Sequence, residues 1–212
     1  MFCNLKSLGL TIAAVMAMSA VMASTASATP QFTASAYPAT VTGSNTKGSE
    51  VLTTEGGKVE CDSHFVSHSL AAASSTLTVT PTYTECTAFG LGATVNTEGC
   101  AYILHATAKD FVTTHTHHFD VTCPTGKSIK IIAGGGLCRM EIKGQTGLTG
   151  VDTHLSFRSI RTVFTLAGVF YTVTTDSFGC PFNGTGNKSG GEYTGEVTVS
   201  RVGGGSVEVS GE

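Results

Sequence analysis

The chain has 212 residues, a formal net charge of −3 at pH 7 and 13% charged residues. It contains no basic cluster that would contact a phosphate backbone, which argues against nucleic-acid binding. Threonine and glycine are abundant and tryptophan is absent, and β-branched threonine favours strands over helices.

Residues 1–28 have the pattern of a cleaved secretory signal peptide. Lys6 precedes an apolar run from Leu8 to Ala23, and Ala26-Ser27-Ala28 supplies the small residues that a signal peptidase needs. The apolar run is shorter than the roughly 20 residues that span a bilayer. We therefore expect cleavage, no membrane span in the mature chain, and a secreted, extracellular protein.

The mature chain, residues 29–212, is predicted to form one all-β domain, with residues 29–38 as a loosely held N-terminal arm. Thr76–Thr84 alternates apolar and polar residues, as a half-buried strand does. Pro81 inside this run cannot donate to a ladder, which predicts a sheet edge or a bulge there. Further strands are predicted at Ala39–Gly43, Glu50–Thr54, Val59–Leu70, Thr94–Ala108, His118–Cys123, Ser128–Ala133, Cys138–Lys143, Val163–Thr175, Tyr193–Val202 and Ser206–Ser210.

Glycine-bearing turns separate these strands, and no helical pattern lies between them. Short connections of this kind favour antiparallel pairing, so the predicted fold is an antiparallel β-sandwich or flattened barrel stapled by disulfides. The longest polar interval, residues 144–152, is interpreted as turn, from Gly144 to Gly150. It also marks the boundary if the chain instead forms two sandwiches.

Six cysteines remain after signal cleavage, and an even number in an exported chain indicates a disulfide framework with fifteen possible pairings. One scheme pairs Cys86 with Cys100 across the Gly90-Leu91-Gly92 turn, Cys123 with Cys138, and Cys61 with Cys180. A competing scheme joins Cys100 to Cys123, which lie about equally far from a hairpin centre near residue 112. Alternation within Cys138–Lys143 places Cys138 on the core face.

Histidines cluster at His115, His117 and His118. On an extended strand His115 and His117 share a face about 7 Å apart. Two imidazoles at this spacing can bind one metal ion if further ligands come from a neighbouring strand. The competing interpretation is a polar hairpin tip with no bound metal.

Local catalytic signatures are missing from the sequence. Gly126-Lys127-Ser128 lacks the glycine that a phosphate-binding loop requires five positions earlier, and no Gly-x-Ser-x-Gly or His-Glu-x-x-His pattern occurs. The sequence therefore favours a secreted, non-catalytic binding or structural module without a cofactor over an enzyme. Its expected partner is an extracellular ligand or a cell-surface component. The alternative is a metal-binding or metal-dependent extracellular protein that uses the segment from His115 to His118.

Four segments together resemble a group of uncharacterised secreted proteins of soil actinobacteria. They are the run from Leu77 to Cys86, Gly99-Cys100-Ala101-Tyr102, Thr122-Cys123-Pro124-Thr125-Gly126 and Gly191-Glu192-Tyr193-Thr194-Gly195. The resemblance spans roughly residues 55–200 and does not include the histidine segment. It implies an exported, bacterial, β-rich domain and no particular activity.

Overall fold

The computed structural model describes residues 29–45, 48–67, 69–107, 114–154, 160–204 and 207–210. The expected signal peptide, residues 1–28, lies outside this part of the chain. The elements are β1 (Gln31–Ala34), β2 (Val41–Asn45), β3 (Glu50–Thr54), β4 (Gly57–Ser67), β5 (Thr76–Ala88), β6 (Leu91–Asn96), β7 (Ala101–His105), β8 (Thr114–Thr122), β9 (Ile129–Ala133), the 3-10 turn η1 (Gly134–Gly136), β10 (Cys138–Ile142), β11 (Gln145–His154), β12 (Ile160–Asp176), β13 (Gly186–Arg201) and β14 (Val207–Ser210).

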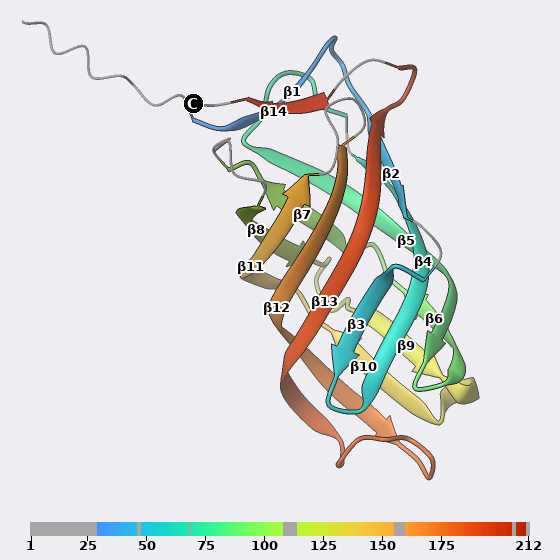
Figure 1. The fold of residues 1–212 in the computed structure, drawn as a ribbon. Coiled ribbons are helices and arrows are strands. Elements are labelled where there is room, and N and C mark those ends of the chain that lie inside the picture. The colour runs from blue at the N-terminus through green and yellow to red at the C-terminus, as the bar shows by residue number, and fades with distance from the viewer. Residues whose placement is uncertain are drawn as a thin grey trace, which may run out of the picture.

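The strands form a closed antiparallel barrel with an upper and a lower half that share four long strands (Figure 1). The long strands β4, β5, β12 and β13 run through both halves. In the upper half they are joined by β2, β7, β8 and β11, and in the lower half by β3, β6, β9 and β10, so each half has eight strands. Of the two predicted architectures, the sequence thus adopts the barrel.

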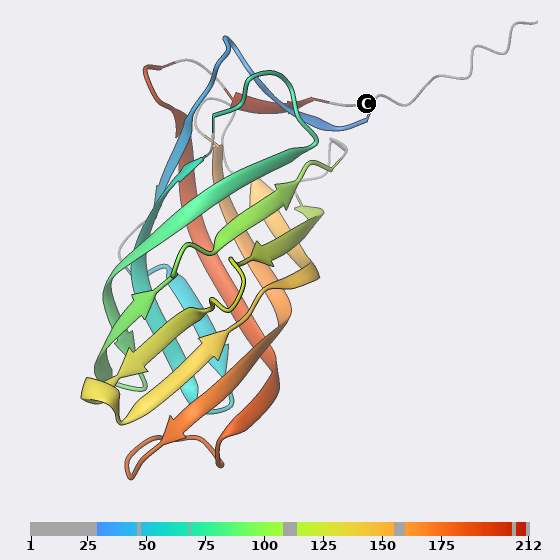
Figure 2. The same cartoon turned by 180° about the vertical axis from the view of Figure 1, so that it is seen from behind.

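The small sheet of β1 and β14 lies across the upper end (Figures 1 and 2). The segment expected to be a loose arm contains β1, which pairs with β14 over Gln31–Ala34. Phe32 is buried in a small apolar cluster with Ala39, Val41 and Leu70. Burial of this aromatic ring anchors the N-terminal segment, a contact that the short polar stretch in the sequence does not predict.

Alternating burial confirms several predicted strands. In β10, Cys138, Met140 and Ile142 are buried while Arg139 is exposed. Pro81 pairs with Phe65 of β4, and the ladders of β7 and β6 with β5 end at Val79 and resume at Thr87. Pro81 therefore occupies a stretch of β5 that has a strand partner on one side in the described residues, as its missing N–H predicted.

Two predictions of secondary structure were wrong. Most of the interval interpreted as turn belongs to β11, which pairs with β8 and with β12. A side chain on Gly150 would meet Leu166 at 2.3 Å, so glycine here permits close packing and does not mark a turn. The single strand predicted at Thr94–Ala108 is two strands, because Glu98 and Gly99 adopt positive φ values between them.

Three disulfides staple the barrel wall: Cys61–Cys86, Cys100–Cys123 and Cys138–Cys180. The competing prediction of Cys100–Cys123 is confirmed, because both residues flank the ladder in which Ala101 pairs with Thr122. Three intramolecular disulfides are characteristic of proteins from oxidising compartments. Within the described residues, no helix is long and apolar enough to cross a membrane.

The scheme of Cys86–Cys100, Cys123–Cys138 and Cys61–Cys180 was wrong. It assumed that the strands on either side of the Gly90 turn stay paired as far as the cysteines. In the described residues β6 pairs with β5 at Thr87 and Ala88 and then runs along β9. Cys86 is therefore bonded to Cys61 on the other neighbour, β4.

Candidate functional site

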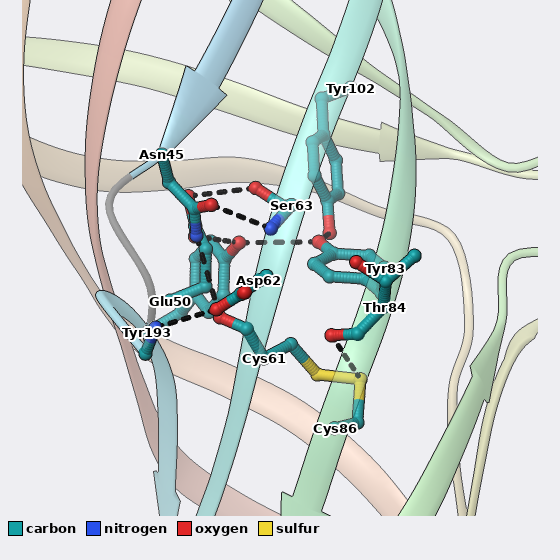
Figure 3. Close-up of a disulfide and its surroundings, with 11 residues drawn as sticks. Asn45, Glu50, Cys61, Asp62, Ser63, Tyr83, Thr84, Cys86, Tyr102 and Tyr193 are labelled. Atoms are coloured by element: carbon teal, nitrogen blue, oxygen red, sulfur yellow. Dashed lines mark hydrogen bonds between the residues drawn. A yellow bond between two sulfur atoms is a disulfide. The ribbon is translucent and has the colours of Figure 1, made fainter.

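Glu50, whose carboxyl group is buried inside the barrel, is the centre of a hydrogen-bonded network (Figure 3). It begins β3, in which Glu50, Leu52 and Thr54 alternate as the buried residues. The Glu50 side chain is 3% exposed. Ser63 Oγ donates a hydrogen bond to Glu50 Oε1 at 3.1 Å, and Tyr193 Oη donates to Glu50 Oε2.

Two further tyrosines extend the network across the barrel. The hydroxyls of Tyr193 and Tyr83 lie 3.2 Å apart, and Tyr83 is hydrogen-bonded in turn to the hydroxyl of Tyr102. These rings come from β13, β5 and β7, and Figure 3 shows their hydroxyls converging above the Cys61–Cys86 disulfide. Residues distant in sequence thus satisfy one another's polar atoms in the interior, as buried polar groups must.

Burial controls the ionisation of the network. Desolvation raises the pKa of Glu50 from its ordinary value of 4.5 to about 7, against the opposing effect of the hydrogen bonds from Tyr193 and Ser63. Desolvation also raises the pKa values of Tyr83, Tyr102 and Tyr193 above their usual range, and the nearby Glu50 charge adds to this. The three phenols therefore stay neutral, and the network takes up or releases one proton, at Glu50, near neutral pH.

Glycine on β13 makes room for this arrangement. A Cβ on Gly195 would lie 2.5 Å from Glu50 Oε2 and 2.5 Å from Phe164 Cζ. Phe164 packs against the Tyr193 ring with centroids 5.6 Å apart. The φ of Gly195 lies outside the left-handed region, so the backbone conformation does not require glycine there. Close packing does.

The predicted histidine segment lies in β8. His115 pairs in register with Asp152, His117 with Gly150 and His118 with Thr149. The side chains of His115 and His117 lie outside the described part of the structure, and that of His118 is exposed. Among the described side chains, no three histidine, cysteine or acidic residues are grouped as metal ligands. The metal site therefore stays a prediction.

A histidine–aspartate pair that the sequence did not predict lies between β7 and β8. His105 Nε2 is 2.9 Å from Asp120 Oδ2, and the Gly147 amide donates to Asp120 Oδ1 at 2.8 Å. The hydrogen bond from the Gly147 amide, followed by that with His105, holds the pKa of Asp120 below its usual range. The pair fastens the β11 bulge at Gly147 to β8. The sequence alone predicts this pair only weakly, because the contact between His105 and Asp120 depends on the register between β7 and β8.

The lower tip is the second candidate site, and we define it as Leu137 and Phe178 with the loops that hold them. Phe178 is fully exposed and Leu137 is 42% exposed. The Cys138–Cys180 disulfide joins the two loops, and the Ser177 amide donates to the Leu137 carbonyl at 3.1 Å. Two apolar side chains are therefore presented to solvent from a cross-linked support.

No protein-family model, no curated protein and no solved structure matches the chain.

Proposed function

We propose that the mature protein is a secreted, non-catalytic binding module that engages a protein of the cell surface through its lower tip. The observation that carries the proposal is the exposure of Phe178 on a loop fixed by the Cys138–Cys180 disulfide. Aromatic anchors dominate the energy of many protein interfaces. A cross-linked loop loses little conformational entropy on binding, which increases affinity.

The interior network supports a role at the surface. A catalytic acid or base must lie within hydrogen-bond reach of a substrate proton. Glu50, Tyr83, Tyr102 and Tyr193 instead direct their polar atoms at one another inside the wall. These groups stabilise the barrel, and we assign the binding function to its ends.

Binding of the labelled mature protein to intact cells of the species that secretes it tests this proposal. We expect saturable binding that protease treatment of the cells abolishes, as a protein partner requires. The double variant Leu137→Ser, Phe178→Ser should lose about 2 kcal/mol, roughly thirtyfold in Kd. Its stability should change by less than about 0.5 kcal/mol, because both side chains are exposed.

The matched control is Val202→Ser, which alters an apolar residue that is 53% exposed and follows the opposite end of β13. This variant should bind as tightly as the native protein. Equal binding by the tip variant, binding that survives protease treatment, or no saturable binding to the cells would contradict the proposal.

A further inference from the structure

Arg139 adds a positive charge to the apolar lower tip. Its side chain is exposed on β10, two residues after Leu137. A Cβ built on Gly136 would lie 3.1 Å from Arg139 Nη2, so the guanidinium group lies back against η1, the turn that leads into Leu137. The tip therefore presents a cation beside an exposed apolar side chain.

No described side chain neutralises the Arg139 guanidinium group. Its cross-strand neighbours are Ile132 of β9 and Thr175 of β12, and neither is charged. The next residue on the same face of β10 is Glu141, but this carboxylate accepts a hydrogen bond from Ser128 Oγ at 3.2 Å. The guanidinium group is therefore available to an anion from outside the chain.

Lys188, another cation of the lower half, shows the opposite arrangement. Its Nζ lies 2.8 Å from Glu55 Oε1 and donates a hydrogen bond to the Asn183 carbonyl at 3.0 Å. These contacts fasten the loop after Cys180 to the β3–β4 hairpin. The charge of Lys188 is thus neutralised within the protein, in contrast to that of Arg139.

We propose that the cell-surface partner binds the lower tip through a carboxylate that pairs with Arg139, beside an apolar site that accepts Phe178 and Leu137. This inference rests on the proposed function and names the chemistry of its partner, an acidic side chain next to an apolar pocket. Phe178 and Leu137 supply apolar contact that does not depend on charge. Arg139 supplies the directional contact that selects the partner.

Arginine favours a protein carboxylate as the anion. Its planar guanidinium group matches the two oxygens of a carboxylate and forms two parallel hydrogen bonds with it. Binding to an anionic membrane instead depends on several basic residues that lie together. The loops that hold Leu137 and Phe178 contain no lysine or arginine, so Arg139 is a single charge and not part of a cluster. One arginine beside exposed apolar side chains is typical of a protein interface.

Binding of the labelled mature protein to intact cells of the secreting species tests the inference. Arg139→Gln should weaken binding about tenfold or more, because a carboxylate enclosed at the interface loses its partner. Arg139→Lys should restore only part of the affinity, because an ammonium group cannot form the two parallel hydrogen bonds.

The matched control is Lys143→Gln, which removes the same charge. Lys143 is exposed and directly follows β10, four residues and about 13 Å along the extended chain from Arg139. Charges at this separation are largely screened in physiological salt, so Kd should change by less than about twofold. Both glutamine variants should unfold at the native urea concentration, because both side chains are exposed.

Blocking the carboxylates on the cells tests the pair directly. Treatment with a water-soluble carbodiimide and ethanolamine converts carboxylates to neutral amides. It should weaken the binding of the native protein and of Lys143→Gln to the level of Arg139→Gln, and it should leave the binding of Arg139→Gln unchanged. Two groups in direct contact are non-additive in this way.

Native affinity in Arg139→Gln, or equal weakening of all three proteins by the treatment, would overturn the inference. If the variant Leu137→Ser, Phe178→Ser still lost binding in that case, the proposed function would stand alone. Binding to vesicles of phosphatidylcholine and phosphatidylserine that Arg139→Gln abolishes would assign the anion to a lipid and would also overturn the inference.

Discussion

Replacing Gly195 by alanine tests the packing around the buried carboxyl. The new Cβ would lie 2.5 Å from both Glu50 Oε2 and Phe164 Cζ, far inside van der Waals contact. Neither neighbour is free to move, because Glu50 is hydrogen-bonded to Tyr193 and the Phe164 ring packs against that same tyrosine. The substitution must therefore displace the centre of the network.

Overpacking of this kind costs about 1–3 kcal/mol. Because Gly195 lies outside the left-handed region, alanine also restricts the unfolded chain and recovers about 0.4–1 kcal/mol. The expected net loss is about 1–2 kcal/mol, which corresponds to a decrease of roughly 2–8 °C in Tm for a chain of this size.

Urea unfolding at pH 6 with the disulfides intact measures this loss. Gly92→Ala is the control, because Gly92 is an exposed strand residue whose φ is not left-handed and at which a Cβ would meet no atom within 4 Å. It should be as stable as the native protein or slightly more stable. If Gly195→Ala unfolds at the same urea concentration as Gly92→Ala, the described packing of Glu50 and Phe164 is wrong.

Three further predictions concern stability and metal content. Because the folded state raises the pKa of Glu50 from 4.5 to about 7, its protonated form favours folding: this contribution is full below pH 4.5, falls as the pH rises and is lost above about 7. The fall amounts to about 3 kcal/mol, and chemical denaturation at several pH values should show it in the native protein and not in Glu50→Gln. Loss of the Cys100–Cys123 bridge in a double serine variant should lower the free energy of unfolding by about 3 kcal/mol, and peptide mapping of the native protein should recover the two cysteines in one linked fragment. Metal analysis of untagged secreted protein should find no stoichiometric zinc or copper, whereas a bound metal that disappears in His115→Ala, His117→Ala would favour the metal-binding alternative.

The strands were predictable where local alternation coincides with the final burial. Cys138, Met140 and Ile142 alternate with polar residues and are buried in β10. The pairing of Cys100 with Cys123 could also be predicted from the sequence, because the two cysteines lie about equally far from the centre of a local hairpin. Strand β11 could not be predicted from the sequence. Glycine is typical of turns, but Gly150 is needed here because the Leu166 side chain packs closely against it.

The network at Glu50 was not predicted, although one signal was present. Glu50 has the same parity as Leu52 in a predicted strand, and this parity places its side chain on the buried face. Its partners Tyr83, Tyr102 and Tyr193 come from strands that meet it only after the barrel closes. Local patterns carry no information on such contacts, which depend on register and closure.

Titration of the Glu50 carboxyl by NMR, with carbon-13 in the glutamate side chains and assignment by loss of the signal in Glu50→Gln, tests the central claim most directly. A midpoint near 7 is predicted, because burial outweighs the hydrogen bonds that the carboxyl accepts. A midpoint near the ordinary value of 4.5 would contradict it, because it would mean that water reaches the Glu50 carboxyl.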